Sequence, residues 1–586
     1  MELDVIDRTT GAASRASGEW TLAVGVSLGT ALLVIIPFFL FGNAWGQDFM
    51  FHATSWMDVA SQWKEGILYP RWTEGANSGF GEPRFIFYPP LSWMLGAGLG
   101  LVLPWKVVPA AFIVIVQTLA GLNFYALAKR FLSRQGALWG AACYLANPYA
   151  LLDIYMRSAF AELLACAVIP AVVLASLELS GLAGTRERSL PRATAFFAVA
   201  FAAIWLSNVP AGIMVSYSVA LIFAWATVEE RSLRPCWNGV KGLLLGFGLI
   251  GFYIVPVIYE QHWTSIAQMF PAGSFQFLYA QLDSRAVAGR LPFHWIASNV
   301  AVLLVVIGAA AGVAVYCRTE QQNSIQKKLW RVLLLLAVTA IFLMTRLGSI
   351  FWTYLPKLFV MQFPWRWIGI LAIAYALALA AALSNRHGQW MRSAVAIAII
   401  SGSGISLVKK ALWNTEDIFA LQQAVASDKG FFGWPEYSPK GVSFFDLPQN
   451  APRVSVLEPE GSKMDPSNAQ IRLTQWTAEE KNMHVTSKEP ARVALRLFNY
   501  PAWRVEVNGK TVTTLPNKLD QVIVPVPAGE SAVRVAFVRT PDRLYGDILS
   551  GASFLLLAIM HLASKRAPDS MAAAFLSIPT MCLTHF

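Results

Sequence analysis

Long apolar stretches recur along almost the whole chain and constrain its fold more than any other feature. A lipid bilayer offers the backbone no hydrogen-bond partners, so apolar stretches that cross it do so as α-helices. Of all residues, 56% are hydrophobic and only 14% are charged. The chain is therefore predicted to be a mainly α-helical, polytopic membrane protein. About 12 stretches are candidate transmembrane helices: Trp20–Phe41, Val107–Ala128, Gly136–Leu152, Ala159–Leu179, Ala193–Leu206, Gly212–Val228, Gly239–Pro256, Asn299–Cys317, Val332–Met344, Trp365–Leu383, Ala394–Val408 and Leu544–Ala563.

The basic residues predict how these helices are oriented. The net charge of +11 arises mainly in short loops between apolar stretches, which indicates a topology signal and no nucleic-acid partner. The stretch Leu91–Leu103 is short and lies between Pro90 and Pro104. If it does not cross, nearly all basic loops fall on the side of the N-terminus, with Lys409, Lys410 and the loop near Arg285 as exceptions. We therefore expect a surface or re-entrant helix there, and both termini in the cytoplasm.

After the eleventh candidate helix the composition changes. From Asn414 to Thr540 the chain is polar, with alternating runs that are typical of β-strands. The Asn508–Gly509 pair in VNGK predicts a hairpin turn. We expect a β-sandwich of seven to eight strands on the outer face, with a core of its own. The predicted domains are 1–413, which includes a first outer loop at 42–106, then 414–540, and finally 541–586 with the last helix and a cytoplasmic tail.

The first outer loop has a distinctive start, just past the first membrane exit. Asp48 is followed four residues later by His52, and apolar residues from Phe51 to Gly66 recur roughly at helical spacing. A carboxylate at the lip of a bilayer, beside aromatic rings, suits a general base for a substrate that arrives in the membrane. The alternative is that Asp48 only caps the helix that follows it.

The predicted topology gathers ionisable residues at the outer face. Such groups are rare in membrane proteins unless they build a site, so together they favour a phosphate-bearing ligand. Arg157 and Arg366 suit bidentate contacts with a phosphate, and Lys106 or Lys357 would add a point charge. Taken singly, each cation is more typical of a side chain that reaches lipid headgroups. The gathered residues are Asp48, Asp58, Arg84, Lys106, Asp153, Arg157, Glu162, Glu260, Lys357 and Arg366.

Aromatic residues cluster at the same face, in QFPWRW, YPRW and FIFYPPL. An interfacial aromatic belt explains any one ring, but flat rings beside carboxylates also suit sugar binding. No spacing such as HExxH predicts a metal site. The five cysteines suggest neither a disulfide framework nor a zinc site.

Several motifs together resemble one bacterial family. The chain reads GQDFMFH, GILYPRW, GFGEPRFIFYPPL, LLDIYMRSAFAE, LPKLFVMQFPWRW and YPAWRVEVNGK. In these motifs it resembles the bacterial membrane proteins labelled 6-pyruvoyl-tetrahydropterin synthase-related, which belong with the GT-C glycosyltransferase-like superfamily. The resemblance implies a GT-C-like helix arrangement in the cytoplasmic (inner) membrane, with the β-domain outside. It also implies a monosaccharide donor on a polyprenyl phosphate, reached from the surrounding lipids, and a glycan, lipid or protein acceptor.

The resemblance also implies roles for residues. Asp48 would be the general base of an inverting transfer, oriented together with the acceptor by His52 and Glu162. Arg157, Lys106 and Arg366 would bind the donor phosphate. GQDF has a single acid where many superfamily members have two, which weakens a metal-dependent mechanism; no cofactor is certain, and a divalent cation stays open. The predicted sugar or acceptor contacts are Asp153, Tyr155, Tyr69, Arg71, Trp72, Tyr88, Glu260 and Trp365.

Two other functions remain open from the sequence. A transporter or flippase for a lipid-linked glycan would use the same cationic face without a base, although no internal inverted repeat is evident. A non-catalytic envelope assembly factor would bind a glycan or partner through its β-domain. Replacement of Asp48 separates the first alternative from the enzyme, because a transporter needs no base.

Overall fold

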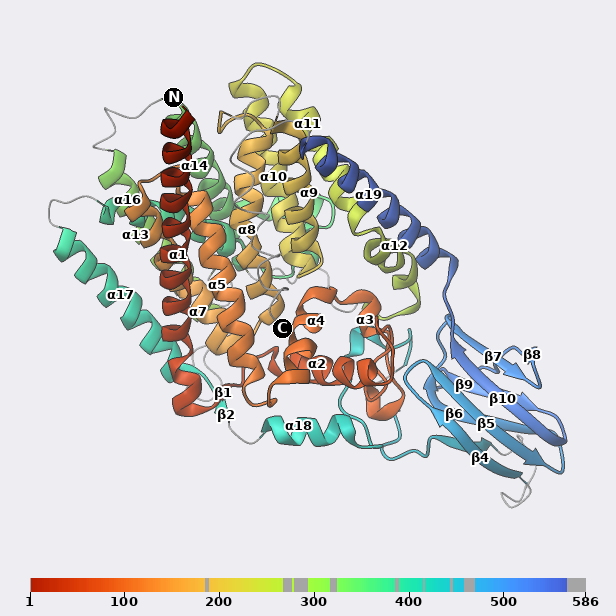
Figure 1. The fold of residues 1–586 in the computed structure, drawn as a ribbon. Coiled ribbons are helices and arrows are strands. Elements are labelled where there is room, and N and C mark those ends of the chain that lie inside the picture. Colours follow the sequence, from red (N-terminus) through yellow and green to blue (C-terminus); the bar gives the residue numbers. More distant parts are fainter. Residues whose placement is uncertain are drawn as a thin grey trace.

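The computed structural model describes residues 2–184, 189–266, 277–278, 293–316, 324–384, 389–414, 417–442, 446–457 and 469–565, with the backbone alone at 2–17, 417 and 563–565. These residues form a bundle of helices with a β-domain at one end (Figure 1). The tail predicted after the last helix, from residue 566 on, lies outside the described residues.

Eight helical segments of the described residues are long and apolar enough to cross a membrane, which confirms a multi-pass membrane protein. Most of them leave many apolar side chains on the surface of the bundle, where lipid would cover them. They are α1 (Glu2–Phe41, from Gly18), α5 (Val108–Ala128), α8 (Phe160–Leu179), α10 (Val209–Glu229), α13 (Phe293–Tyr316), α16 (Ile368–Leu383) with the turn before it, α17 (Gln389–Lys410) and α19 (Pro541–Lys565).

Two further predicted spans are bent. Helices α11 (Arg234–Leu249) and α12 (Gly251–Glu260) diverge by 75°, so the span predicted at Gly239–Pro256 is broken near Ile250. At this bend Gly251 lies against Gly546 of α19, where an added Cβ would come within 2.9 Å of a carbonyl oxygen. The second bend, of 90°, follows α14 (Ser324–Met344) and leads into α15 (Ser349–Tyr354). Each bent pair counted as one span brings the total to ten.

The remaining two predicted spans are short helices. Helix α9 spans Leu190–Trp205, and α6 spans only Arg134–Leu145. The chain then breaks at Asn147, whose side-chain oxygen accepts hydrogen bonds from the first backbone N–H groups of α7 (Pro148–Leu152). Because Pro148 cannot continue the preceding helix, the stretch predicted as one span becomes two helices. By length and composition, the described residues therefore contain eight to ten candidate spans, fewer than the expected number of about 12.

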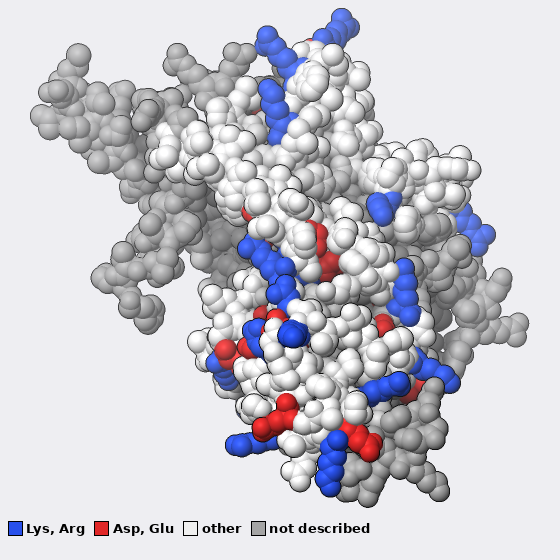
Figure 2. Space-filling model, turned by 90° about the vertical axis from the view of Figure 1, so that its right-hand side faces the viewer, with Lys and Arg blue, Asp and Glu red and all other residues white. Residues whose placement is uncertain are grey.

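The two ends of the bundle differ in chemistry. Figure 1 places the start of α1 and the end of α19 at one end, and the β-domain at the other. Basic residues at the first end form ion pairs with acids, such as Lys129 with Glu19 and Lys328 with Glu230. Figure 2 shows a mostly uncharged band between the basic side chains at the top and the mixed charges of the lower half. This band is the surface expected to face lipid.

The first outer loop folds against the end of the bundle. It contains α2 (Phe49–Lys64), η1 (Asn77–Gly79), α3 (Arg84–Phe87) and α4 (Pro90–Val102), which packs on α2. At 13 residues α4 is too short for the span test, in line with the prediction that Leu91–Leu103 does not cross. Helix α18 (Asp417–Ala426) lies along the other side of α2 (Figure 1).

The β-domain contains two antiparallel sheets. Five strands follow the order β4-β5-β10-β7-β8, and three follow β3-β6-β9. Asn508 and Gly509 both have positive φ between β7 and β8, as the predicted hairpin turn requires. A further strand pair joins β1 (Asn43–Ala44) to β2 (Trp413–Asn414). The bounds are β3 Val454–Leu457, β4 Ala469–Trp476, β5 Glu480–Ser487, β6 Ala491–Phe498, β7 Trp503–Val507, β8 Lys510–Thr511, β9 Gln521–Val526 and β10 Gly529–Phe537.

The β-domain has an apolar core, but the first outer loop shares it. Phe51, Trp72 and Phe80 of the first outer loop belong to the same buried apolar cluster as the inner faces of the two sheets. The Trp72 ring lies 5.4 Å from the ring of Trp503 in β7. These loop side chains would otherwise be exposed, so burial against the sheets stabilises both parts. The strands of the two sheets begin only at β3; α18 and the chain after it pack on the first outer loop.

Candidate functional site

The site is built on a turn that joins two outer loops. The backbone N–H of Asp48 donates to the carbonyl of Arg157 at 2.8 Å, and that of Gly46 donates to Ser158 Oγ at 3.0 Å. Ser158 Oγ in turn donates to the Ala44 carbonyl at 2.7 Å. A Cβ at Gly46 would lie 2.2 Å from the carbonyl carbon of Arg157. Only glycine therefore lets this turn approach Arg157 so closely.

Asp48 occupies the N-cap position of α2, but its side chain makes no capping hydrogen bond. Its Oδ2 instead lies 3.7 Å from Arg157 Nη2, and the side chain stays 42% exposed. The alternative that Asp48 only caps the helix is therefore wrong. The carboxylate is held beside a guanidinium and remains open to a ligand.

Arg157 is the centre of a buried ionic cluster. Its Nη1 donates to Asp153 Oδ1 at 2.6 Å and to Glu162 Oε2 at 2.7 Å. Its guanidinium carbon lies 4.8 Å from the centre of the Trp365 ring, and the side chain is only 3% exposed. Arg157 ends the π-helical turn η2 (Asp153–Arg157), and Ser158 follows with a positive φ of 51°. A side chain with this many partners in a buried position is fixed.

Arg366 and Tyr149 complete the cluster. Arg366 Nε lies 3.4 Å from Glu162 Oε2, while its Nη1 donates to the Met361 carbonyl at 2.9 Å. The Tyr149 hydroxyl donates to the other oxygen of Glu162. Glu162 therefore links the two guanidiniums from the first turn of α8. The predicted residues Asp48, Asp153, Arg157, Glu162 and Arg366 thus come together in space.

The local charges set the protonation of Asp48. Although 42% of the side chain is exposed, the protein around the carboxyl group partly desolvates it and thereby raises its pKa. The Arg157 and Arg366 guanidiniums oppose that rise, and Glu162 adds to it. The net result is a pKa above the usual value for aspartate. A base with a raised pKa removes a proton more readily, provided that the solution is alkaline enough to ionise it.

His52 lies beside this cluster as a buried, neutral ring. Burial, together with the charges of Arg157 and Arg84, lowers its pKa to about 3. Its Nδ1 is 3.5 Å from Ser92 Oγ, and its ring lies 5.4 Å from that of Phe160. Among the described residues His52 makes no side-chain bond to Asp48, so its predicted orienting role stays a prediction.

Tyr88 lies at the edge of the same cluster. Its ring is half-buried and lies 4.5 Å from the ring of Phe51 and 5.9 Å from that of His52. Burial raises the pKa of its hydroxyl, and the Asp48 carboxylate raises it further. Tyr88 therefore keeps its proton and can donate a hydrogen bond.

Other predicted contacts lie elsewhere or have other partners. The Tyr155 hydroxyl donates to the Val34 carbonyl at 2.6 Å, and the Arg71 guanidinium packs over Tyr69 at 4.5 Å. Lys106 is exposed and makes no ion pair among the described residues. Trp72 and Trp365 are at most 2% exposed, so neither ring presents a free face. Their predicted sugar or phosphate contacts remain predictions.

Glu260, another predicted sugar contact, belongs to a separate cluster. Both of its carboxylate oxygens accept from Arg543 at the start of α19, at 2.8 and 2.9 Å. The Tyr500 hydroxyl of the β-domain donates to one of them at 2.5 Å. Glu260 and Arg543 are both almost fully buried. Glu260 therefore joins α12, α19 and the β-domain.

Several residues at the site were not singled out from the sequence. Gly46 and Ser158 fix the turn that carries Asp48, and Tyr149 holds Glu162. Trp434 follows α18, and its backbone N–H donates to Glu82 Oε2 at 2.9 Å. Its ring lies 5.3 Å from that of Phe51, on α2. The close approach of QDF to MRS had no signal in the sequence, because the two motifs are about 110 residues apart.

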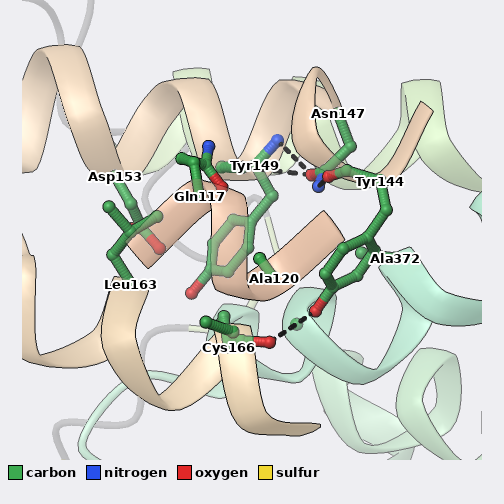
Figure 3. Close-up of a pocket in the computed structure, with 12 residues that line it drawn as sticks. Gln117, Ala120, Tyr144, Asn147, Tyr149, Asp153, Leu163, Cys166 and Ala372 are labelled. Atoms are coloured by element: carbon green, nitrogen blue, oxygen red, sulfur yellow. Dashed lines mark hydrogen bonds between the residues drawn. The ribbon is translucent and has the colours of Figure 1, made fainter. Parts of the chain in front are cut away.

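A small cavity adjoins the cluster, as Figure 3 shows. Its volume is about 20 Å³, and Tyr144, Tyr149 and Asp153 contribute to its lining. In Figure 3 the Tyr144 hydroxyl donates to the Cys166 carbonyl, at 2.7 Å. The cavity is large enough for a single water molecule and too small for a sugar.

Comparisons with known proteins give only distant likenesses. No protein-family model and no curated protein matches the chain. The apo oligosaccharyltransferase of Archaeoglobus fulgidus aligns with a TM-score of 0.36 and 14% identity, over 72% of this chain and 57% of its own. The oligosaccharyltransferase AglB of the same archaeon, in complex with an inhibitory peptide and a dolichol-phosphate, aligns with 0.37 and 14%, over 70% and 56%.

The third solved structure is a mutant form of the arabinofuranosyltransferase AftD from Mycobacteria. It aligns with a TM-score of 0.39 and 16% identity, over 66% of this chain and 27% of its own. The chain thus spans a little more than half the length of the archaeal structures and about a quarter of AftD. The predicted 6-pyruvoyl-tetrahydropterin synthase-related family has no support from these comparisons. The function proposed below rests on the geometry of the site.

Proposed function

We propose that this protein is a membrane glycosyltransferase of the GT-C type. It moves a monosaccharide from a polyprenyl-phosphate donor to an acceptor at the end of the bundle that carries the β-domain. One observation carries the proposal: a half-exposed carboxylate, Asp48, is held at the rim of a buried ionic cluster without capping its helix. The cluster also contains two guanidiniums, Arg157 beside Asp48 and Arg366 beside Glu162, which supply positive charge for a lipid phosphate.

Asp48 acts as the general base. Its closest cationic contact is 3.7 Å away, and within the described part of the chain neither carboxylate oxygen accepts a short side-chain hydrogen bond. Asp48 takes the proton of the acceptor hydroxyl while that oxygen attacks C1 of the donor sugar. The bond from C1 to the phosphate oxygen breaks on the opposite face, and polyprenyl phosphate leaves. This single displacement inverts the configuration at C1.

Arg366 stabilises the charge of the leaving phosphate. Two of its nitrogens face Glu162 and the Met361 carbonyl, and Nη2 makes no hydrogen bond among the described residues. A free guanidinium nitrogen at the site suits an anion whose charge grows as the bond breaks. Lys106 adds charge at the lip, where its backbone carbonyl accepts from Asn43, at the exit of α1. Arg157 is buried beneath Asp48 and holds its carboxylate in place through the 3.7 Å contact.

The acceptor approaches along two aromatic rings. Tyr88 and Trp434 are both half-buried, and their rings contact Phe51 of α2 at 4.5 and 5.3 Å. Each ring presents a flat apolar face and a polar edge, a combination that suits a sugar. The backbone of Trp434 is fixed through Glu82, which also binds Arg84 at 2.6 Å. These contacts favour a carbohydrate acceptor.

The transfer rate should depend on pH through Asp48. The base must be ionised, and the pKa of Asp48 lies above the usual range. The rate should therefore rise with pH along an acid limb that lies above the range of an ordinary aspartate. His52, with a pKa of about 3, stays neutral throughout and contributes no step. A rate profile in saturating donor, read from release of polyprenyl phosphate, measures this limb.

The test uses purified full-length protein in liposomes with a panel of radiolabelled polyprenyl-phosphate sugars. The wild type should release and transfer label, and Asp48→Asn should lose most of that turnover. Donor movement across the bilayer that survives Asp48→Asn would favour a transporter instead. Donor or glycan binding with no turnover in either protein would favour an assembly factor. Both outcomes would overturn the enzyme.

A further inference from the structure

We infer that the guanidinium of Arg157 takes the place of a divalent metal ion, so that this site works with an internal cation. The inference rests on the proposed function, because it concerns the same site, but it is tested separately by metal binding. Mg²⁺ and Mn²⁺ bind where carboxylates from separate segments converge on one point. Here three carboxylates converge, and the point between them holds an arginine.

The three carboxylates come from two parts of the chain that lie far apart in the sequence. Asp48 lies before α2, Asp153 lies in η2, and Glu162 lies in the first turn of α8. Their oxygens are 3.7, 2.6 and 2.7 Å from Arg157 Nη2, Nη1 and Nη1. Within the described residues no group of three histidine, cysteine or acidic side chains is arranged to hold a metal ion. The three carboxylates could supply oxygen ligands, but they surround a guanidinium, which is wider than a metal ion, so their oxygens lie too far apart to bind one ion.

Arg157 cannot easily move aside to admit an ion. Its side chain is 3% exposed, and its guanidinium packs on Trp365 at 4.8 Å. Its backbone is also fixed, because the carbonyl accepts from Asp48 and the next residue, Ser158, binds Ala44. The same residue thus supplies the charge and holds the base. A lysine would supply the charge but not the planar set of N–H donors.

The charges support this assignment. Counted as fully ionised, the three carboxylates and the two guanidiniums of Arg157 and Arg366 leave one negative charge in the cluster. Burial and the Glu162 carboxylate raise the pKa of Asp153, so the real negative charge is smaller than this count. A divalent ion added beside Arg157 would face a positive charge at contact distance. Without the Arg157 side chain the same cluster carries two negative charges, which match one divalent ion. The arrangement also leaves Asp48 a better base, because a carboxylate bound to a metal ion loses basicity.

The first measurement uses the wild type and Mn²⁺ alone. Full-length protein in detergent, stripped with EDTA, is titrated with Mn²⁺ and bound ion is read by electron paramagnetic resonance. We expect no saturable bound Mn²⁺, and no loss of turnover in EDTA wherever turnover is detected. Saturable Mn²⁺ in the wild type that Glu162→Gln removes would overturn the inference, whatever the protein transfers.

The second measurement creates the missing site. Arg157→Ala should bind Mn²⁺ at least about tenfold more tightly than the wild type, and Mn²⁺ should raise its melting temperature. Arg157→Lys, which keeps the charge, should not gain affinity, and Glu162→Gln added to Arg157→Ala should remove the gain. If Arg157→Ala folds and gains no Mn²⁺ affinity, the inference fails. If it does not fold, the wild-type titration alone decides.

Discussion

At the residue scale, the site depends on a glycine that has no chemistry of its own. Gly46 lets the turn before α2 lie directly on the Arg157 carbonyl, and this contact sets the distance from Asp48 to the guanidinium. An alanine there would push the turn away, because its Cβ would meet backbone atoms that cannot yield. The Asp48 carboxylate, which we propose as the base, would then shift by about 1 Å relative to its present position.

We therefore predict that Gly46→Ala lowers the transfer rate by about 10²-fold, the loss typical of a misplacement near 1 Å. The protein should still fold, since the turn lies at the rim of the site. Gly25→Ala is the matched control, because nothing lies within 4 Å of a Cβ at that position of α1. Equal rates for Gly46→Ala and the control would show that the turn does not position the base.

The sequence predicted the charged members of the site but not their partners. Asp48, Arg157 and Glu162 stood out because ionisable residues are rare at a membrane face. Their pairing required the three-dimensional approach of two outer loops. Residue type also misleads at two predicted ligand contacts. Trp72 and Glu260 are both buried, where the β-domain joins the first outer loop and α12.

At the element scale, α12, α19 and the β-domain are joined by one buried ion pair. Arg543 binds both oxygens of Glu260, and Tyr500 adds a hydrogen bond from the turn after β6. Loss of one partner of a buried pair leaves an uncompensated charge, which costs about 3–5 kcal/mol. An exposed pair contributes about 1 kcal/mol or less. The chain around the start of α19 takes part in a buried ion pair, Arg543 with Glu260, and in a partly exposed one, Arg539 with Asp547.

We predict that Arg543→Ala speeds amide hydrogen exchange in α12 and the first turn of α19 by more than about 10²-fold, because 1.4 kcal/mol corresponds to tenfold. Arg539→Ala should change exchange by less than about tenfold. Mass spectrometry of the two variants in detergent measures both. Similar exchange in the two variants would mean that the buried pair does not hold the β-domain in place.

Element lengths were partly predictable from hydropathy, and their bends were not. The apolar run through Ile250 continues without a break, so it predicts one straight helix. The bend there follows from packing, since Gly251 and Gly546 let α12 and α19 touch through their backbones. Asn147 gave a clearer local signal, because an asparagine before a proline both caps and starts a helix.

At the scale of the whole molecule, charge predicts which end faces the cytoplasm. The basic end carries Lys129 and Lys328, and the β-domain lies at the opposite end (Figure 1). The orientation of a membrane protein follows the distribution of Lys and Arg, because short loops rich in them stay on the cytoplasmic side. Hydropathy and charge thus gave the multi-pass helical class and the separate β-domain. The core shared by that domain and the first outer loop could not be predicted. The sequence does not indicate which distant residues the aromatic side chains of the loop pack against.

We predict that Cys236, exposed at the start of α11, faces the cytoplasm. In a variant that keeps only this cysteine, a membrane-impermeant maleimide should react only after cells are permeabilised. Lys510→Cys, on the exposed strand β8 in a cysteine-free background, should react in intact cells. Labelling of Cys236 in intact cells, with Lys510→Cys protected, would reverse the topology and place the site on the cytoplasmic side.

The role of Asp48 as general base is tested most directly by comparing two substitutions in one helix region. Asp58 lies in α2, and burial raises its pKa to about 8, so it is mostly neutral near pH 7 and Asn is a close substitute. In liposomes with saturating polyprenyl-phosphate sugar, Asp58→Asn should keep near wild-type transfer. Asp48→Asn should lose about 10²–10⁴-fold while still binding donor. Equal transfer by Asp48→Asn and the wild type would contradict the proposed mechanism.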